Sequence, residues 1–151
     1  MDIRVEIQKL YNCRLLKTEE EFEQFENTLE RLADYNDESI IRELCTVFDD
    51  NTEDEEVMFG LIHFIESVEK EVYLTDMPKA LPNMIENAKE WAMILNKRIL
   101  NHELYRKEYM KILSNMDEPI KLTVVNLLTE IAADNPERFQ FSVNEIIQHL
   151  N

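Results

Sequence analysis

Apolar residues recur at intervals of three and four along almost the whole chain, the spacing that places them on one face of an α-helix. The clearest stripe follows Thr18 and Glu21, a capping-box pair that predicts a helix start. Its members are Phe22, Phe25, Leu29 and Leu32. A helix over 3–15 is predicted before it. A third is predicted from about residue 37, with Ile40, Ile41, Leu44, Val47 and Phe48 facing inward.

Capping residues and prolines mark the breaks between the later stripes. Thr52 and Glu55 repeat the capping-box spacing and predict a helix that buries Met58, Leu61, Ile62, Ile65 and Val68. Pro78 and Pro82 are expected to delimit short segments, with Pro78 in a first helical turn, because proline lacks the N–H that a helix interior needs. A helix over 83–100 is predicted next. Further helices follow, carrying Tyr105, Tyr109, Ile112 and Leu113 and then starting near Pro119, Pro136 and Ser142.

The fold class predicted for residues 1–151 is all-α, in a single domain of seven or eight short helices. One glycine in 151 residues is too few for a β-sandwich or barrel, which need many tight turns. Short helices joined by short turns pack as antiparallel pairs, so a helical-repeat-like array is expected. The sequence itself has no clear period, so this likeness concerns packing only.

Acidic residues outnumber basic ones, with 32 against 16 and a formal net charge of −16. The asymmetry lies in the first half, where residues 1–70 hold 20 acidic and 7 basic side chains. Such a surface repels phosphate backbones and anionic lipids, so we expect neither nucleic acid nor a membrane as partner. A basic protein is the natural complement, and a purely solubilising role is the alternative.

Two groups of carboxylates are candidates for partner binding. The denser one is Asp49, Asp50, Glu53, Asp54, Glu55 and Glu56, and the other is Glu19, Glu23, Glu26 and Glu30 on the polar face of the predicted second helix. The dense group does not match a calcium loop, since Asp54 stands where glycine is needed and Gly60 where glutamate is needed. Favourable charges at a helix start explain two or three of its members. The remainder favours a partner-facing role.

Catalytic motifs are missing from the sequence. His63 lies one helical turn from Glu66, and His149 from Glu145, a spacing open to metal ligation, but neither forms the paired Glu-x-x-His pattern of di-iron proteins. HExxH, a glycine-rich phosphate loop and a serine elbow do not occur. We therefore predict that the chain is not an enzyme and has no catalytic residue, cofactor or bound metal.

The two cysteines, Cys13 and Cys45, lie on apolar stripes without a CxxC spacing, so we expect buried free thiols. No secretory signal is apparent after Met1, and the longest uncharged apolar run, 57–65, is too short to cross a bilayer. The cytoplasm is therefore the expected location.

Trp91, Arg98, Asn101 and Arg106 are candidates for a structural motif. Trp91 lies among apolar neighbours and is expected in the core. The two arginines and Asn101 lie close to a predicted break, where an arginine either pins loop carbonyls or pairs with a carboxylate. We favour such a clamp over a binding site.

From Phe48 to Arg106 the sequence resembles the Immunity protein 30 family, found beside bacterial polymorphic toxins. The resemblance is carried by Phe48-Asp49-Asp50, the run EEVMFGLIHFIE at 55–66, Ala88 with Glu90-Trp91, Arg98-Ile99-Leu100-Asn101 and Arg106. It implies a cytoplasmic protein that binds and neutralises a cognate toxin domain, as in toxin–antitoxin pairs and contact-dependent inhibition. It does not specify the toxin's activity.

The leading hypothesis combines this resemblance with the charge. An acidic surface within residues 19–56 would cover a basic active-site or substrate groove of the toxin and inhibit it stoichiometrically. Two alternatives remain open, a helical-repeat adaptor and an all-α metal-dependent hydrolase that uses carboxylates and His63. A basic toxin gene immediately upstream would favour the first hypothesis, and metal in the purified protein would favour the hydrolase.

Overall fold

The computed structural model describes residues 2–35 and 40–151, and regular structure in these ranges is entirely helical. The α-helices are α1 (Ile3–Asn12), α2 (Glu19–Ala33), α3 (Ile41–Leu44), α4 (Glu55–Glu66), α5 (Lys70–Asn87), α6 (Lys89–Leu100), α7 (Glu103–Ser114), α8 (Glu118–Asp134) and α9 (Pro136–Leu150). A short 3-10 helix, Cys45–Val47, continues α3. The predicted all-α class is confirmed, although nine α-helices in the described ranges exceed the seven or eight expected.

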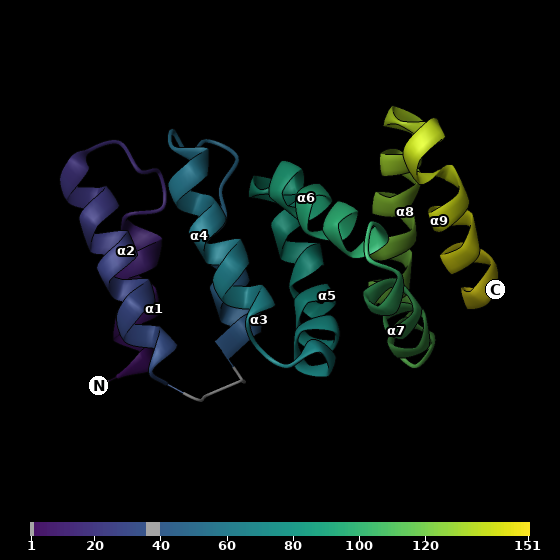
Figure 1. Cartoon of the computed structure of the whole chain (residues 1–151), viewed down its shortest axis with the longest axis horizontal. Helices are drawn as coiled ribbons and strands as arrows, with labels where there is room; N and C mark the ends of the chain where they lie inside the picture. The colour runs from purple at the N-terminus through teal and green to yellow at the C-terminus, as the bar shows by residue number, and fades with distance from the viewer. Residues whose placement is uncertain (1, 36–39) are drawn as a thin grey trace.

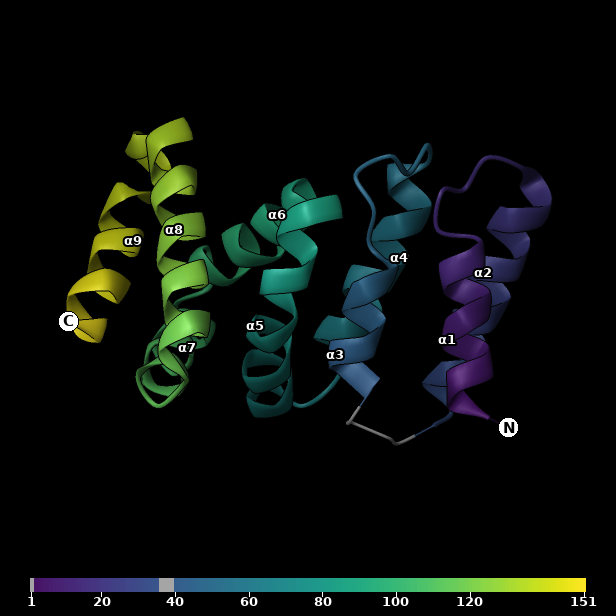
Figure 2. The same cartoon turned by 180° about the vertical axis from the view of Figure 1, so that it is seen from behind.

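The helices stack side by side along one long axis, with α1 and α2 at one end and α8 and α9 at the other (Figures 1 and 2). The expected antiparallel pairs occur at both ends, where α1 packs on α2 and α8 packs on α9. Between them α2 packs on α4 and α3 packs on α5. The central helix α5 contacts α3, α4, α6, α7 and α8, so it joins the two halves of the array.

One hydrophobic core runs through the whole stack, because every α-helix contributes buried apolar residues to it. Some residues of the predicted stripes, such as Phe22, Leu29 and Val68, are only partly buried. Phe25 and Leu32 on α2 and Met58 and Leu61 on α4 are completely buried. The predicted third helix corresponds to α3 and the 3-10 helix that continues it, and its first predicted residues, 37–39, lie outside the described residues. All five of its inward-facing residues are nevertheless buried.

Helix starts follow the capping prediction in one case and depart from it in another. At α2 the Thr18 side chain accepts a hydrogen bond from the N–H of Glu21 (3.1 Å), as predicted. At α4 the predicted cap is wrong, because the carboxylate of Asp54 accepts the first-turn N–H (3.1 Å) instead of Thr52. Thr52 is buried, and its hydroxyl donates to the backbone carbonyl of Arg14. A tertiary partner therefore takes the side chain that local spacing assigns to the cap.

The predicted roles of Pro78 and Pro82 are also wrong, since both lie inside α5. Each proline removes one backbone hydrogen bond, but the apolar face of α5 is buried against five other helices, and that burial outweighs the loss. The single helix predicted over 83–100 is accordingly two helices. They meet at Ala88, where the backbone leaves the helical region (φ −142°, ψ 38°).

Both cysteines are buried free thiols, as predicted. Cys13 donates a weak hydrogen bond to Oε1 of Gln24 at 3.4 Å. Burial raises the pKa of the Cys45 thiol to about 12, so this thiol stays protonated at neutral pH and is not a nucleophile.

Candidate functional site

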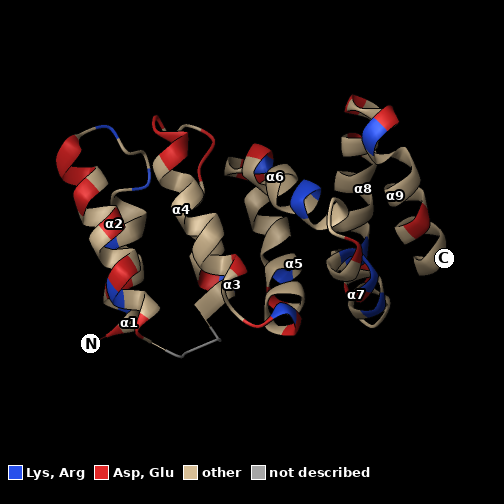
Figure 3. Ribbon diagram, in the orientation of Figure 1, with Lys and Arg blue, Asp and Glu red and all other residues tan. Residues whose placement is uncertain are grey.

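Acidic residues are concentrated where the N-terminal ends of α2 and α4 lie at the same edge of the molecule (Figure 3). We call seven exposed carboxylates the acidic surface: Glu19 and Glu23 in the first half of α2, Glu26 and Glu30 further along the same face of that helix, and Glu53, Glu55 and Glu56 at the start of α4. Within residues 2–35 and 40–151 none of the seven forms an ion pair with a basic side chain. Their negative charge is therefore not neutralised by the fold.

The helix that carries most of this surface is anchored by a buried carboxylate. Glu6 on α1 is 6% exposed, and its carboxylate accepts hydrogen bonds from Arg31 on α2 (3.0 and 3.1 Å) and from Lys9 (3.2 Å). Burial alone would raise the pKa of Glu6, but these hydrogen bonds and the two positive charges lower it. Glu6 therefore remains ionised and fixes α2 against α1.

The expectation that Asp49 faces a partner does not match its surroundings. Asp49 is 7% exposed, and its carboxylate accepts hydrogen bonds from Nε of Arg14 (3.1 Å) and from the N–H of Asn51 (2.8 Å). An ionised side chain this buried needs both partners. Asp49 therefore ties the loop before α4 to the end of α1, and the acidic surface does not include it.

Asp50, although exposed, caps a helix that begins about forty residues later. Its carboxylate accepts hydrogen bonds from the N–H of Glu90 (3.1 Å) and of Trp91 (3.4 Å), in the first turn of α6. The residue at the N-cap of α6 is Ala88, which has no side-chain acceptor. The N–H of Asp50 also donates to the carbonyl of Asn87 at 2.9 Å. Asp50 thus supplies the capping oxygen that α6 lacks.

Trp91 completes this junction and is buried as predicted, with 3% of its surface exposed. Its Nε1–H donates to the carbonyl of Asp49 at 3.1 Å. Its ring stacks on Phe48 (centroids 5.6 Å apart) and meets the edge of Phe59 on α4 (5.5 Å). The Phe48-Asp49-Asp50 and Glu90-Trp91 motifs therefore form one packed junction, which we call the Trp91 junction. It fixes the start of α4 relative to α6.

Arg106 and Asn101 hold the turn between α6 and α7. Nη1 of Arg106 donates to the carbonyl of Leu100 (3.0 Å), and its Nε donates to Glu145 on α9 (3.1 Å). Asn101 accepts a hydrogen bond from Nε of Arg138 at 3.3 Å. These contacts act as the clamp that we favoured from the sequence.

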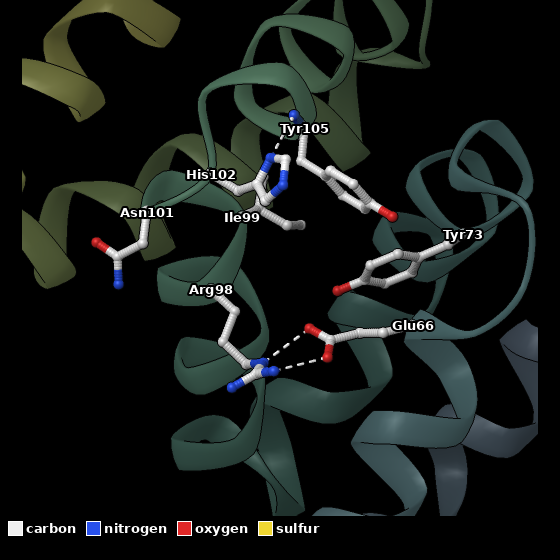
Figure 4. A pocket seen from close by; sticks show the side chains of 7 residues that line it. All are labelled: Glu66, Tyr73, Arg98, Ile99, Asn101, His102 and Tyr105. Carbon is white, nitrogen blue, oxygen red and sulfur yellow. Dashed lines mark hydrogen bonds and ion pairs between the residues drawn. The ribbon is translucent and has the colours of Figure 1, made fainter.

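Arg98 has a different setting, on the rim of a pocket with a volume of about 400 Å³ (Figure 4). It binds the carboxylate of Glu66 through two hydrogen bonds of 2.7 Å each. The rest of the lining is Tyr73, Ile99, Asn101, His102 and Tyr105. Sequence reasoning did not find this pocket, because its residues come from α4, α5, α6 and α7 and share no local pattern.

The Tyr73 side chain lies at the floor of this pocket and is 1% exposed. Its hydroxyl points toward the hollow between Glu66, Arg98 and Tyr105 (Figure 4) and has no hydrogen-bond partner. Burial raises the pKa of Tyr73, so its hydroxyl is protonated at neutral pH. An unsatisfied buried hydroxyl costs about 1–3 kcal/mol.

A second fully buried tyrosine, Tyr109, provides a matched comparison, because its hydroxyl donates to Oδ1 of Asn96 at 2.7 Å. Tyr109→Phe leaves the buried Oδ1 of Asn96 without its hydrogen-bond donor and is expected to lower the free energy of unfolding by about 1–3 kcal/mol. Tyr73→Phe breaks no hydrogen bond and is expected to leave stability unchanged or slightly higher. Urea unfolding of both variants measures these changes. Equal losses in the free energy of unfolding would contradict the inference that only the Tyr109 hydroxyl is hydrogen-bonded.

His63 does not assemble a metal site in the structure. It is exposed on α4 with its ring 6.1 Å from Phe59, while Glu66, its neighbour one turn along, is engaged by Arg98. Within residues 2–35 and 40–151 no group of three or more His, Cys, Asp or Glu side chains could hold a metal ion. In the same ranges no helix is both long and apolar enough to cross a membrane.

One known protein family matches most of this chain. The chain matches the profile of Immunity protein 30 over residues 12–109, which is more than half of its length. This chain belongs to the Immunity protein 30 family. The match begins well before Phe48, so it covers α2 and α3 as well as the Trp91 junction and the pocket. Comparison with curated proteins and with solved structures gives no match.

Membership implies that the chain is an immunity protein whose partner is a toxin. It also favours a role without catalysis of its own. The residues that carried the resemblance in the sequence now have physical roles, because Asp50 and Trp91 lie in the junction and Arg98 lies on the pocket rim.

Proposed function

We propose that this immunity protein neutralises its cognate toxin by binding it in the cytoplasm, with the acidic surface covering a basic active-site or substrate groove. The observation that carries the proposal is the group of seven exposed carboxylates, none of which forms an ion pair with a basic residue in 2–35 or 40–151. Carboxylates four residues apart on a helix, such as Glu19 and Glu23 or Glu26 and Glu30, repel one another, and a basic partner would relieve that repulsion.

The supporting framework also suits a binding role. Glu6 holds α2 on α1, and the Trp91 junction holds the start of α4, so the acidic surface needs little ordering when a partner binds. Exposed charges chiefly speed association and reject mismatched partners. Apolar anchors elsewhere in the interface would supply most of the affinity. In this mechanism the inhibitor occupies the groove and takes part in no chemical step.

The test is whether this protein protects a cell against the toxin encoded by the neighbouring gene. The toxin domain encoded next to this gene is produced alone, and then together with this protein, in a bacterial host. We expect growth arrest alone, restored growth together, a 1:1 complex on size exclusion with light scattering, and loss of toxin activity at equimolar inhibitor.

Three results would contradict the proposal. Absence of a complex would exclude direct binding, and a stable complex with full toxin activity would exclude occlusion. Protection at far less than one inhibitor per toxin would indicate catalysis and reopen the hydrolase hypothesis.

A further inference from the structure

The pocket beneath Arg98 is independent of the acidic surface and has the features of a ligand site. Its volume of about 400 Å³ lies within the range of small-molecule pockets. Its floor carries the unpartnered, buried hydroxyl of Tyr73, and its walls come from four different helices (Figure 4). An occupant that hydrogen-bonds this hydroxyl would remove the cost of leaving it unsatisfied.

The charges around the pocket indicate that its occupant is neutral. Glu66 and Arg98 pair through two hydrogen bonds of 2.7 Å, so together they present no net charge. A carboxylate entering the pocket would meet Glu66. An ammonium group would meet Arg98.

The hydrogen-bonding groups indicate an occupant that both donates and accepts. Nδ1 of His102 accepts the N–H of Tyr105 (3.4 Å), which leaves Nε2 of the neutral ring as a donor. The Tyr73 hydroxyl is a further donor, while the Glu66 oxygens keep free lone pairs as acceptors. A carboxamide combines one carbonyl acceptor with N–H donors in a single plane.

The shape of the walls indicates that this group is flat. The rings of Tyr73 and Tyr105 lie 6.4 Å apart at 55° to each other, and Ile99 adds an apolar wall. These surfaces suit the faces of a planar group. We propose that the pocket binds a neutral, planar carboxamide, with its carbonyl on the Tyr73 hydroxyl and its N–H on Glu66.

Three probes of the same shape and different charge test the proposal: benzamide (neutral), benzoate (−1) and benzamidine (+1). Each is titrated into the isolated protein at neutral pH and followed by NMR shifts of the Ile99 methyl groups and the Tyr105 ring. We expect saturable binding of benzamide, tighter than that of benzoate or benzamidine. No saturable binding of benzamide, or tighter binding of either charged probe, would overturn the proposal.

Two variants and a matched control locate the contacts. Tyr73→Phe should weaken benzamide binding about threefold to tenfold, the value of one neutral hydrogen bond. Tyr11→Phe, on exposed Tyr11 outside this pocket, should leave binding unchanged. Glu66→Gln removes the negative charge and should raise the affinity for benzoate relative to benzamide. Unchanged binding in Tyr73→Phe, an equal loss in Tyr11→Phe, or an unchanged preference in Glu66→Gln would each overturn the assignment.

The natural carboxamide has two possible sources, a free small molecule or an Asn or Gln side chain of the partner. Titrating benzamide into the complex with the toxin domain separates them. Lost benzamide binding indicates a side chain of the toxin in the pocket, and retained binding indicates a free ligand. The titrations of the isolated chain need no toxin, so their failure is distinct from failure of the proposed function.

Discussion

Trp91→Ala is expected to lower the free energy of unfolding by about 3–5 kcal/mol, the cost of emptying a large aromatic site in a packed core. The indole is 3% exposed and lies between the rings of Phe48 and Phe59. Loss of the indole also leaves the carbonyl of Asp49 without the hydrogen bond that it accepts from Nε1–H of Trp91. Urea unfolding followed by circular dichroism measures the effect, since the variant lacks the chain's one tryptophan fluorophore.

Two further variants distinguish the hydrogen bond of Trp91 from its packing and provide a control for loss of an exposed aromatic ring. Trp91→Phe retains an aromatic ring but removes the donor, and should lose about 1–3 kcal/mol. Phe141→Ala removes an aromatic ring that is 77% exposed, and should change stability by no more than about 0.5 kcal/mol. If Trp91→Ala cost no more than Phe141→Ala, the Trp91 junction would not stabilise the fold.

Reversing four carboxylates of the acidic surface is expected to slow association with the toxin by about tenfold or more at low salt, through lost electrostatic steering. The set Glu23, Glu26, Glu30 and Glu53 is chosen because these residues are exposed and lie outside the first helical turns. Glu19, Glu55 and Glu56 are left intact, because they complement the helix dipoles. Stopped-flow association rates measure the effect.

A control with the same total charge distinguishes a local surface from net charge. Lysine at Glu86, Glu108, Glu130 and Asp134, in the second half of the chain and outside the first helical turns, also raises the formal net charge from −16 to −8. This control should slow association by less than about threefold. Raising salt should slow the unchanged protein too, because screening shortens the reach of exposed charges to about 8–10 Å. Equal slowing by the two sets would refute a role for the acidic surface.

Helical periodicity predicted the core because it is a local property. The stripe through Phe25 and Leu32 and the inward residues of α3 need only the pitch of a helix, and the structure buries them. Glycine scarcity likewise predicted the fold class. Trp91 was placed correctly for the same reason, from its apolar neighbours on one helical face.

The errors and omissions involve partners far apart in the chain. Thr52 has the spacing of a cap but donates to Arg14, and Asp50 caps a helix about forty residues later. Pro78 is tolerated inside α5 because tertiary burial compensates for its lost hydrogen bond. The unpartnered hydroxyl of Tyr73 becomes apparent only when four helices are placed around it. None of these tertiary contacts produces a periodic pattern in the sequence.

The family match ends at residue 109, inside α7, yet the hydrophobic core does not end there. Leu127, Leu128 and Ile131 on α8 are at most 1% exposed and belong to the same core as α5 and α6. The α8–α9 pair packs against α5, α6 and α7, and cutting the chain at the family boundary would leave these three helices with an open apolar flank.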